Sequence, residues 1–251
     1  MTRVAVKEQE LNELRWWSHW AKVLMLDETS YIITSPVFQE PLFNHATIVG
    51  DKRNSVEAID RAVKLFRDVG VPPSFFVIDD RRYEGAKSAL MSSGFSSKDM
   101  LEVMVAKRAL EYPETSVKMA EANADVSAWV KSYVASFYDG DAPVSAIESA
   151  AANAAKDKDA SLLVARRGEE VLGQLALFRQ GGLLGAYCVG TIPLHRRSGV
   201  AGQMLAYAIR GAEKQNLRLV LQTFASDDLA GFYSSRGFET VYRKLVMLPE
   251  R

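Results

Sequence analysis

The sequence predicts an α/β protein in which a mixed sheet is flanked by helices, built from two similar halves of the chain. Short apolar runs alternate with helical patterns along most of the sequence, as is typical of strands and helices that share one core. The order strand, helix, strand, helix, strand is predicted twice. Each copy has a Gly-Phe pair after its second helix, at 94–95 and at 237–238.

The composition is that of an ordinary globular protein, with 251 residues, of which 48% are hydrophobic and 25% are charged. Lys plus Arg equals Asp plus Glu, at 31 each, so no overall field favours nucleic acid or a membrane surface as a partner. The one cysteine excludes an internal disulfide and any cysteine-based metal site. We therefore expect no metal and, since no apolar leader or spanning run is seen, a cytoplasmic protein.

In the first half, Leu11, Leu14 and Trp17 recur at helical spacing and predict a helix over 8–25. A near capping box and a closing glycine predict a second helix over 54–69. The other predicted elements are strands within 30–50, a strand at 74–78, a helix over 83–92 and a strand at 100–107.

In the second half, a proline and polar flanks mark 109–116 as the linker that precedes it. The order then reads β-α-α-β-β-β-α-β-α-β. The predicted elements are a strand at 116–122, helices over 125–138 and 144–156, three meander strands between 161 and 190, a helix over 203–214, a strand at 217–223, a helix over 229–236 and a last strand from 238.

A turn of small and basic residues separates the strand that ends near Val189 from the helix predicted over 203–214. Small residues let a backbone approach a ligand closely, and the first N–H groups of a helix carry partial positive charge. Such a turn suits a phosphate or pyrophosphate, although it has neither a Walker loop nor the G-x-G-x-x-G spacing. The alternative is a glycine-rich helix start without a ligand. The residues of the turn are Arg196, Arg197, Ser198, Gly199, Val200, Ala201 and Gly202.

This turn resembles the acyl-CoA-binding segment of the GNAT superfamily of N-acetyltransferases. The pattern of that segment, Arg/Gln-x-x-Gly-x-Gly/Ala, is met by Arg196, Gly199 and Ala201. A second GNAT pattern, a tyrosine followed by Gly-Phe, is met by Tyr233 and the pair at 237–238. The resemblance extends from 116 to the C-terminus and implies the V-shaped GNAT sheet, with acetyl-CoA in the gap where two parallel strands splay apart.

The resemblance also implies how acetyl-CoA is held, with no metal. The backbone N–H groups of 197–202 would bind the pyrophosphate, and Arg196 and Arg197 would add charge. Val189 and Thr191 would bond the pantetheine and thioester through their backbones, with the Val189 N–H facing the developing oxyanion.

Two further roles follow from the same resemblance. Tyr233 is the implied proton donor to the leaving thiolate. Ser226 stands where many family members have Asn, and it is counted with the cofactor-binding residues. Direct transfer needs no covalent carrier, so Cys188 is interpreted as a packing residue. His195 lies inside the turn, where exposure is slightly favoured over a phosphate contact.

The first half is interpreted as a degenerate GNAT-like copy over 1–112, and the catalytic domain is predicted over 116–251. Between its strands the first half has no glycine at the helix start, and Leu90 falls where Tyr233 stands. The leading hypothesis is an acetyl-CoA-dependent N-acetyltransferase that acts on a primary amine, with a small-molecule acceptor preferred to a protein. A non-catalytic acyl-CoA-binding or partner-binding module is the alternative. The acceptor, the general base and the oligomeric state stay open.

Overall fold

The computed structural model describes residues 6–28, 30–49, 52–107 and 116–250. The chain divides into two compact units that do not follow its order. Unit 1 consists of Met1–Met104, Gln222–Gly231 and Thr240–Arg251, and unit 2 consists of Val105–Leu221 and Phe232–Glu239. Two segments of the predicted second half thus pack within unit 1. The division at 1–112 and 116–251 stays a prediction, and most of the expected linker lies outside the described residues.

In unit 1 the strands lie in the order β1-β2-β3-β4-β11-β5. The pairs β1–β2, β2–β3 and β4–β11 are antiparallel, and β3–β4 is parallel. The sheet is therefore mixed, as predicted. Its elements are α1 (Val6–Trp17), β1 (Lys22–Met25), β2 (Tyr31–Thr34), η1 (Pro41–Phe43), β3 (His45–Ile48), α2 (Lys52–Val69), β4 (Phe75–Ile78), η2 (Arg81–Tyr83), α3 (Glu84–Ser92), β5 (Phe95–Ala106), η4 (Ala225–Asp227) and β11 (Phe238–Pro249).

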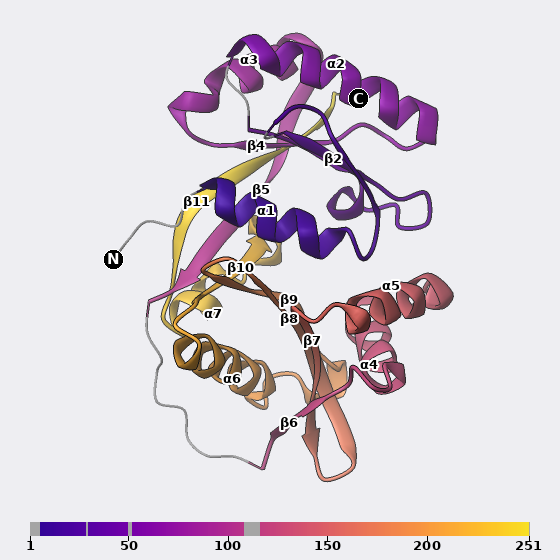
Figure 1. Ribbon diagram of the computed structural model, residues 1–251, viewed down its shortest axis with the longest axis vertical. Helices are drawn as coiled ribbons and strands as arrows, with labels where there is room; N and C mark the ends of the chain where they lie inside the picture. The colour runs from indigo at the N-terminus through magenta and orange to yellow at the C-terminus, as the bar shows by residue number, and fades with distance from the viewer. Residues whose placement is uncertain (1–5, 29, 50–51, 108–115, 251) are drawn as a thin grey trace. The chain divides into compact units, whose positions relative to one another are not determined.

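Alternate residues of the unit 1 strands face two different layers of helices. Phe75 and Val77 of β4 join the main apolar core with residues of α2 and α3, whereas Phe76 belongs to a separate cluster. On β2, Ile32 faces the α2 side while the Tyr31 hydroxyl donates to Glu10 of α1. The two helices α2 and α3 thus cover one face of these strands and α1 covers the other (Figure 1).

The helix predicted over 8–25 is wrong in its second part. Helix α1 ends at Trp17, and residues 22–25 form strand β1, which pairs with β2 as a hairpin. The apolar pattern continues past the end of the helix, because Trp20, which follows it, is buried like Trp16 and Trp17 within it. Residues 22–25 have apolar residues at helical spacing, but they form a strand because they pair with β2.

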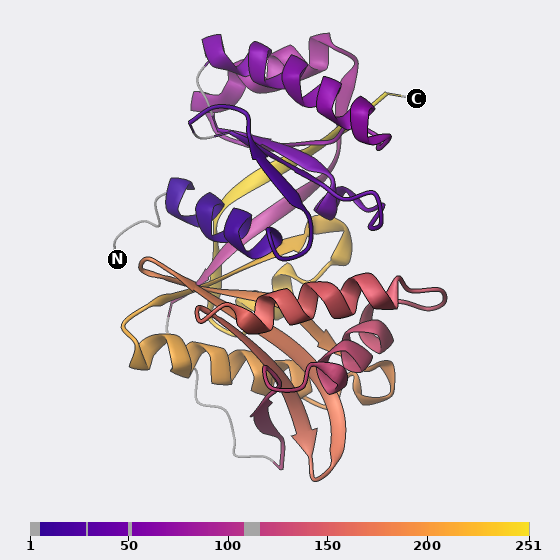
Figure 2. The same ribbon diagram turned by 45° about the vertical axis from the view of Figure 1, so that its right-hand side comes forward.

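In unit 2 the strands lie in the order β10-β9-β8-β7-β6, antiparallel except for the parallel pair β9–β10. Helices α4 and α5 cover one face and α6 the other (Figure 2). The elements are β6 (Lys118–Glu121), α4 (Ser127–Phe137), α5 (Val144–Lys156), β7 (Ala160–Arg167), β8 (Glu170–Gln180), β9 (Leu183–Thr191), η3 (Pro193–His195), α6 (Val200–Lys214), β10 (Arg218–Phe224) and α7 (Ala230–Ser234).

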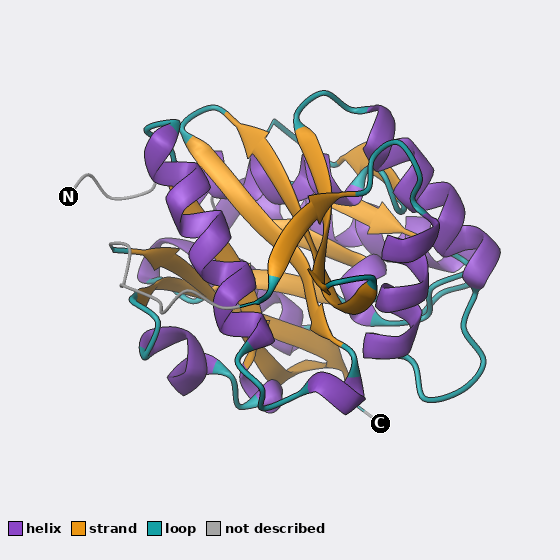
Figure 3. Ribbon diagram, turned by 90° about the horizontal axis from the view of Figure 1, so that it is seen from below, coloured by secondary structure: helices purple, strands orange, loops and turns teal. Residues whose placement is uncertain are grey.

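The predicted class, mixed α/β, is confirmed: in each unit, strands of mixed direction are flanked by helices (Figure 3). The order strand, helix, strand, helix, strand occurs at β3-α2-β4-α3-β5 and again at β9-α6-β10-α7-β11. Gly94 and Gly237 both have a left-handed backbone, with φ of 81° and 83°, before the last strand of each run. That the two runs descend from one repeated unit stays a prediction. Among the described residues, no helix has the length and apolar character that crossing a membrane requires.

Candidate active site at the end of strand β9

The parallel pairing between β9 and β10 is short. It joins Leu183, Leu184 and Gly185 to residues 218–220, and the register ends there although β9 continues to Thr191. Val189 and Thr191 therefore lie beyond the last paired residue, on a strand edge that β10 no longer covers. Within the described residues, the buried Thr191 hydroxyl also has no hydrogen-bond partner. This is the kind of opening in which a ligand can bond to a strand backbone.

A turn with an unusual backbone leads from β9 into α6. Arg197 and Gly199 have φ of 61° and 84°, both left-handed. Successive residues of opposite handedness point their N–H groups to one side and form a concavity that suits anions. The Ser198 hydroxyl donates to the His195 carbonyl at 2.6 Å and holds the turn closed.

Helix α6 begins directly after this turn, without a side-chain cap. The Gln203 N–H donates to the Gly199 carbonyl at 3.1 Å, so the N–H groups of Val200, Ala201 and Gly202 precede the helical ladder. They point out of the helix N-terminus, where the macrodipole favours negative charge. The expected start at residue 203 was too late, because the left-handed Gly199 ends the turn and Val200 is already buried.

The Arg196 guanidinium bonds to the protein's own backbone. Its guanidinium donates to the Thr191 carbonyl at 3.3 Å and to the Ser136 carbonyl at 3.0 Å, near the C-terminus of α4. A cation is favourable at a helix C-terminus, so this side chain anchors the turn to α4. Arg196 and Arg197 are both exposed, but the Arg196 guanidinium is engaged by these two carbonyls. Of the two arginines, Arg197 is the one whose charge is available to an anion.

Two other sequence candidates have defined places. The His195 side chain is only 15% exposed, and its Nε2 lies 3.4 Å from Glu170 Oε1, so the exposure favoured from the sequence does not hold. Burial raises the pKa of the Cys188 thiol far above its ordinary value. A thiol so difficult to ionise is a poor nucleophile, in keeping with its interpretation as a packing residue.

Tyr233 and Ser226 lie in different units. Tyr233, in unit 2, is 7% exposed and packs edge to face on Phe238, with ring centroids 6.0 Å apart. Ser226 lies in unit 1, where its hydroxyl donates to Asp99 Oδ2 at 2.6 Å. Because the Ser226 hydroxyl proton is used in that bond, the hydroxyl oxygen can only accept a hydrogen bond from a ligand.

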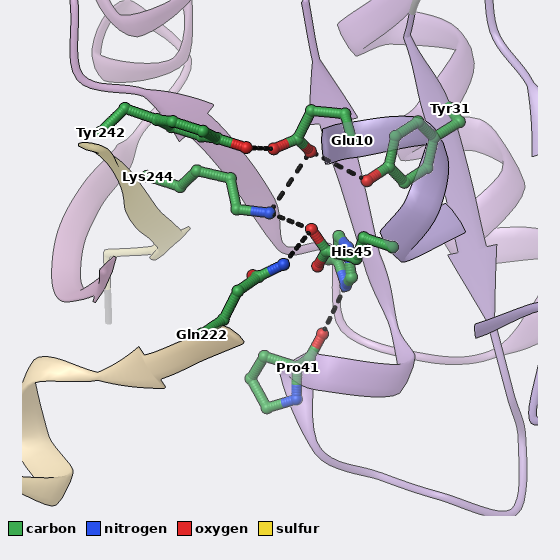
Figure 4. A network of polar contacts seen from close by, with 8 residues as sticks. Glu10, Tyr31, Pro41, His45, Gln222, Tyr242 and Lys244 are labelled. Carbon is green, nitrogen blue, oxygen red and sulfur yellow. Dashed lines mark hydrogen bonds and ion pairs between the residues drawn. The ribbon is translucent and has the colours of Figure 1, made fainter. Parts of the chain in front are cut away.

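Sequence reasoning missed a buried polar network in unit 1 (Figure 4). Lys244 of β11 is fully buried and pairs with Glu13 and, at 3.3 Å, with Glu10. Glu10 also accepts hydrogen bonds from Tyr242 at 2.6 Å and Tyr31 at 3.0 Å. The available signal was a lysine directly before the apolar residues 245–248 of the last strand, since a lysine is almost never fully buried without a partner.

Burial governs the pKa values in this network. It raises the pKa of Glu10, with Glu13 acting in the same direction and Lys244 opposing both. Burial alone would lower the pKa of Lys244, but the two carboxylates outweigh it and raise that pKa. Gln222 of β10 completes the shell by donating to Glu13 at 2.7 Å. The cluster is thus a buried ion pair shared by α1 and β11, with two carboxylates for one ammonium.

His45 borders the network and carries a pH dependence. Its ring stacks on Phe76 at 3.9 Å and its Nδ1 donates to the Pro41 carbonyl at 3.1 Å, while its buried Nε2 has no hydrogen-bond partner in the part of the chain that the structure describes. Burial, reinforced by Lys244, lowers the pKa of His45 from 6.5 to about 3. Between these values the unfolded chain binds a proton that the folded chain does not. The contribution of neutral His45 to the unfolding free energy is therefore fully present above about pH 6.5, and it is lost as the pH falls toward about 3.

We expect this histidine to cost the wild type about 2 kcal/mol of unfolding free energy between pH 7 and pH 5. The control is His45→Phe, which keeps a flat ring on Phe76 without a titrating group. Urea unfolding of both proteins at the two pH values measures the difference, and titration of the other groups cancels in it. Equal losses in the two proteins would show that His45 is protonated in the fold.

Comparisons with known proteins agree with this geometry. Residues 158–240 match the family model described as Acetyltransferase (GNAT) domain. A GCN5-related N-acetyltransferase from Kribbella flavida is similar over 99% of this chain and 97% of its own, with TM-score 0.71 and 15% identity. A GNAT-family acetyltransferase from Colwellia psychrerythraea is similar over 99% of this chain and 99% of its own, with TM-score 0.58 and 12% identity. A GCN5-related N-acetyltransferase from Sphaerobacter thermophilus is similar over 87% of this chain and 75% of its own, with TM-score 0.61 and 13% identity. No curated protein matches the chain.

The family model spans β7 to α7, and so includes β9, the turn at 196–199 and α6, which build the candidate site. At such low identities the structural likeness establishes the fold alone, and the sequence match covers 158–240. Over that segment the chain is therefore similar to the GNAT acetyltransferase domain, on a fold that GCN5-related N-acetyltransferases share.

Proposed function

We propose that this protein transfers an acetyl group from acetyl-CoA directly to a primary amine. The observation that carries the proposal is the juxtaposition in unit 2 of a strand end without a parallel partner, at Val189–Thr191, and an uncapped helix N-terminus after Gly199. The first can bond to an amide-rich arm and a thioester, and the second to a pyrophosphate. Acetyl-CoA combines these groups in one molecule.

The donor would be held by backbone rather than by side chains. The N–H groups of 197–202 would bond the pyrophosphate oxygens, and Arg197 would add a charge at the mouth. Val189 and Thr191 would bond the pantetheine arm and orient the thioester. The Val189 N–H would stabilise the oxyanion that forms when the carbonyl carbon becomes tetrahedral.

The transfer itself requires that one bond forms and one breaks. The neutral amine nitrogen attacks the carbonyl carbon, and collapse of the tetrahedral intermediate breaks the bond between carbon and sulfur. We assign Tyr233 as the group that gives its phenolic proton to the leaving sulfur. Because the pKa of the Cys188 thiol is raised, a covalent acyl-cysteine intermediate is disfavoured and transfer is direct. The amine proton passes to solvent, and solvent returns a proton to the Tyr233 phenolate, so that the cycle closes.

The acceptor is proposed to be a small amine, and the test is a screen of amines with thiol release as the readout. Polyamines, amino sugars, amino acids and lysine peptides are offered separately with acetyl-CoA. The proposal requires CoA release that depends on one of these amines, with the acetylated product seen by mass spectrometry. Acetyl-CoA binding without turnover on any amine would instead support the non-catalytic module.

A further inference from the structure

Strand β9 departs from regular geometry next to the proposed oxyanion donor. Gln174 lies opposite Gly190 and Ala176 opposite Tyr187, so β9 carries one more residue than β8 between these pairs. The extra length is taken up at Cys188, whose φ is 53°. A left-handed backbone at a residue with a side chain is strained and persists only where its surroundings enforce it.

The side chain of Gln174 supplies that enforcement. It is fully buried, and its Nε2 donates to the Cys188 carbonyl at 3.3 Å. Its Oε1 accepts from the hydroxyls of Ser132 at 2.5 Å and Ser136 at 3.2 Å, both on α4. A carbonyl oxygen can only accept, so the amide can face Cys188 only with its NH₂ group, and the two serines hold it that way round.

Gly190 makes room for this arrangement. A Cβ at Gly190 would lie 2.3 Å from Gln174 Nε2 and 2.8 Å from Ser136 Cβ, so only glycine lets the amide pack against the strand. Arg196 ties the same region together by donating to the Ser136 and Thr191 carbonyls. Hydrogen bonds therefore fix the strand on both sides of Gly190: the Gln174 amide bonds to Cys188 before it, and the Arg196 guanidinium bonds to Thr191 after it.

A bulge changes the neighbouring strand toward which each following N–H points. Val189 is the first residue after the left-handed Cys188, and it lies where β10 no longer pairs. We propose that Gln174 is a positioning residue for acyl transfer, which fixes the bulge at Cys188 and thereby aims the Val189 N–H at the oxyanion. This inference rests on the proposed function, because Gln174 acts through Val189 and does not touch the substrate.

The test compares Gln174→Met with the wild type in acetyl transfer to an amine identified by the screen. Methionine keeps the length and volume of the side chain without the amide. We expect kcat to fall at least about tenfold, since misplacement of a catalytic group by about 1 Å can cost about 100-fold. The KM for acetyl-CoA should stay within about twofold, because the pyrophosphate turn is untouched. Gln180→Met, on the same strand, is the matched control and should leave kcat unchanged.

The outcomes separate this inference from the proposed function. A wild type that transfers no acetyl group refutes the proposed function, and the inference with it. An active wild type with unchanged kcat in Gln174→Met, or with only a raised KM or a lowered melting temperature, overturns the positioning role alone. Should Gln174→Met fail to fold, Ser132→Ala with Ser136→Ala removes the two hydroxyls that hold the amide with its NH₂ group toward Cys188. Lowered kcat in that variant supports the inference, and unchanged kcat overturns it.

Discussion

Lys244→Ala is expected to lower the unfolding free energy by about 3–5 kcal/mol, because it leaves two buried carboxylates without their cation. Glu10 and Glu13 are both almost completely buried, and Lys244 is the ammonium that pairs with them. In the folded protein almost no surface of either residue is accessible to water. Chemical denaturation of the wild type and the variant at pH 7 measures the effect.

The matched control is Lys107→Ala. Lys107 pairs with Glu239, but both side chains are largely exposed, so its loss should cost less than about 1 kcal/mol. Lys244→Met with Glu13→Gln should regain part of the lost stability, since one uncompensated charge is gone. A Lys244→Ala variant as stable as the control would show that the buried carboxylates are protonated and that the ion pair contributes nothing.

Tyr233→Phe is expected to lower kcat by about 100- to 10,000-fold, the usual contribution of a positioned general acid. Phenylalanine keeps the ring that packs on Phe238, so the fold should be retained. Acetyl-CoA affinity should change little, because the turn at 197–202 makes its bonds through the backbone. Steady-state kinetics and calorimetry on one preparation measure both quantities.

Tyr207→Phe on α6 is the control for loss of a phenolic hydroxyl at a more exposed position, and it should leave kcat unchanged. If Tyr233→Phe keeps full turnover, Tyr233 is only a packing residue and the thiolate leaves without its help. If Tyr233→Phe keeps its turnover at neutral pH but loses it as the pH rises above the ordinary pKa of a thiol, the leaving sulfur takes its proton from solvent.

The elements that the sequence predicted best are those whose pattern is local. Helix α5 lies over the residues predicted for it, and the meander strands of unit 2 deviate by one or two residues, because periodicity and turn glycines decide them. The end of α1 could not be predicted, since residues 22–25 owe their strand conformation to β2. The assignment of β11 to unit 1 also depends on a partner far away in the sequence, β4.

The site shows the same division between local and distant information. The glycine pattern around Gly199 indicates the turn because a left-handed residue and a helix start are local requirements. The role of Gln174 could not be seen, because its partners lie 14 residues away at Cys188 and 38 residues away at Ser136. Arg196 was expected to face a ligand, whereas its guanidinium binds carbonyls that only the folded chain brings near.

Calorimetric titration with acetyl-CoA tests the central claim, that the turn before α6 binds this molecule. Ala201→Glu places a carboxylate in the first turn of α6, where it suits the helix dipole but repels a pyrophosphate. Gly211→Glu, on the same helix, adds the same charge where a new side chain meets no atom within 4 Å.

We expect one binding site per chain in the wild type and in Gly211→Glu. Binding should be at least about 100-fold weaker in Ala201→Glu, since two hydrogen bonds to a charged group, worth about 1.5–3 kcal/mol each, are lost. Equal affinity in all three proteins, or no binding by the wild type, would contradict the central claim.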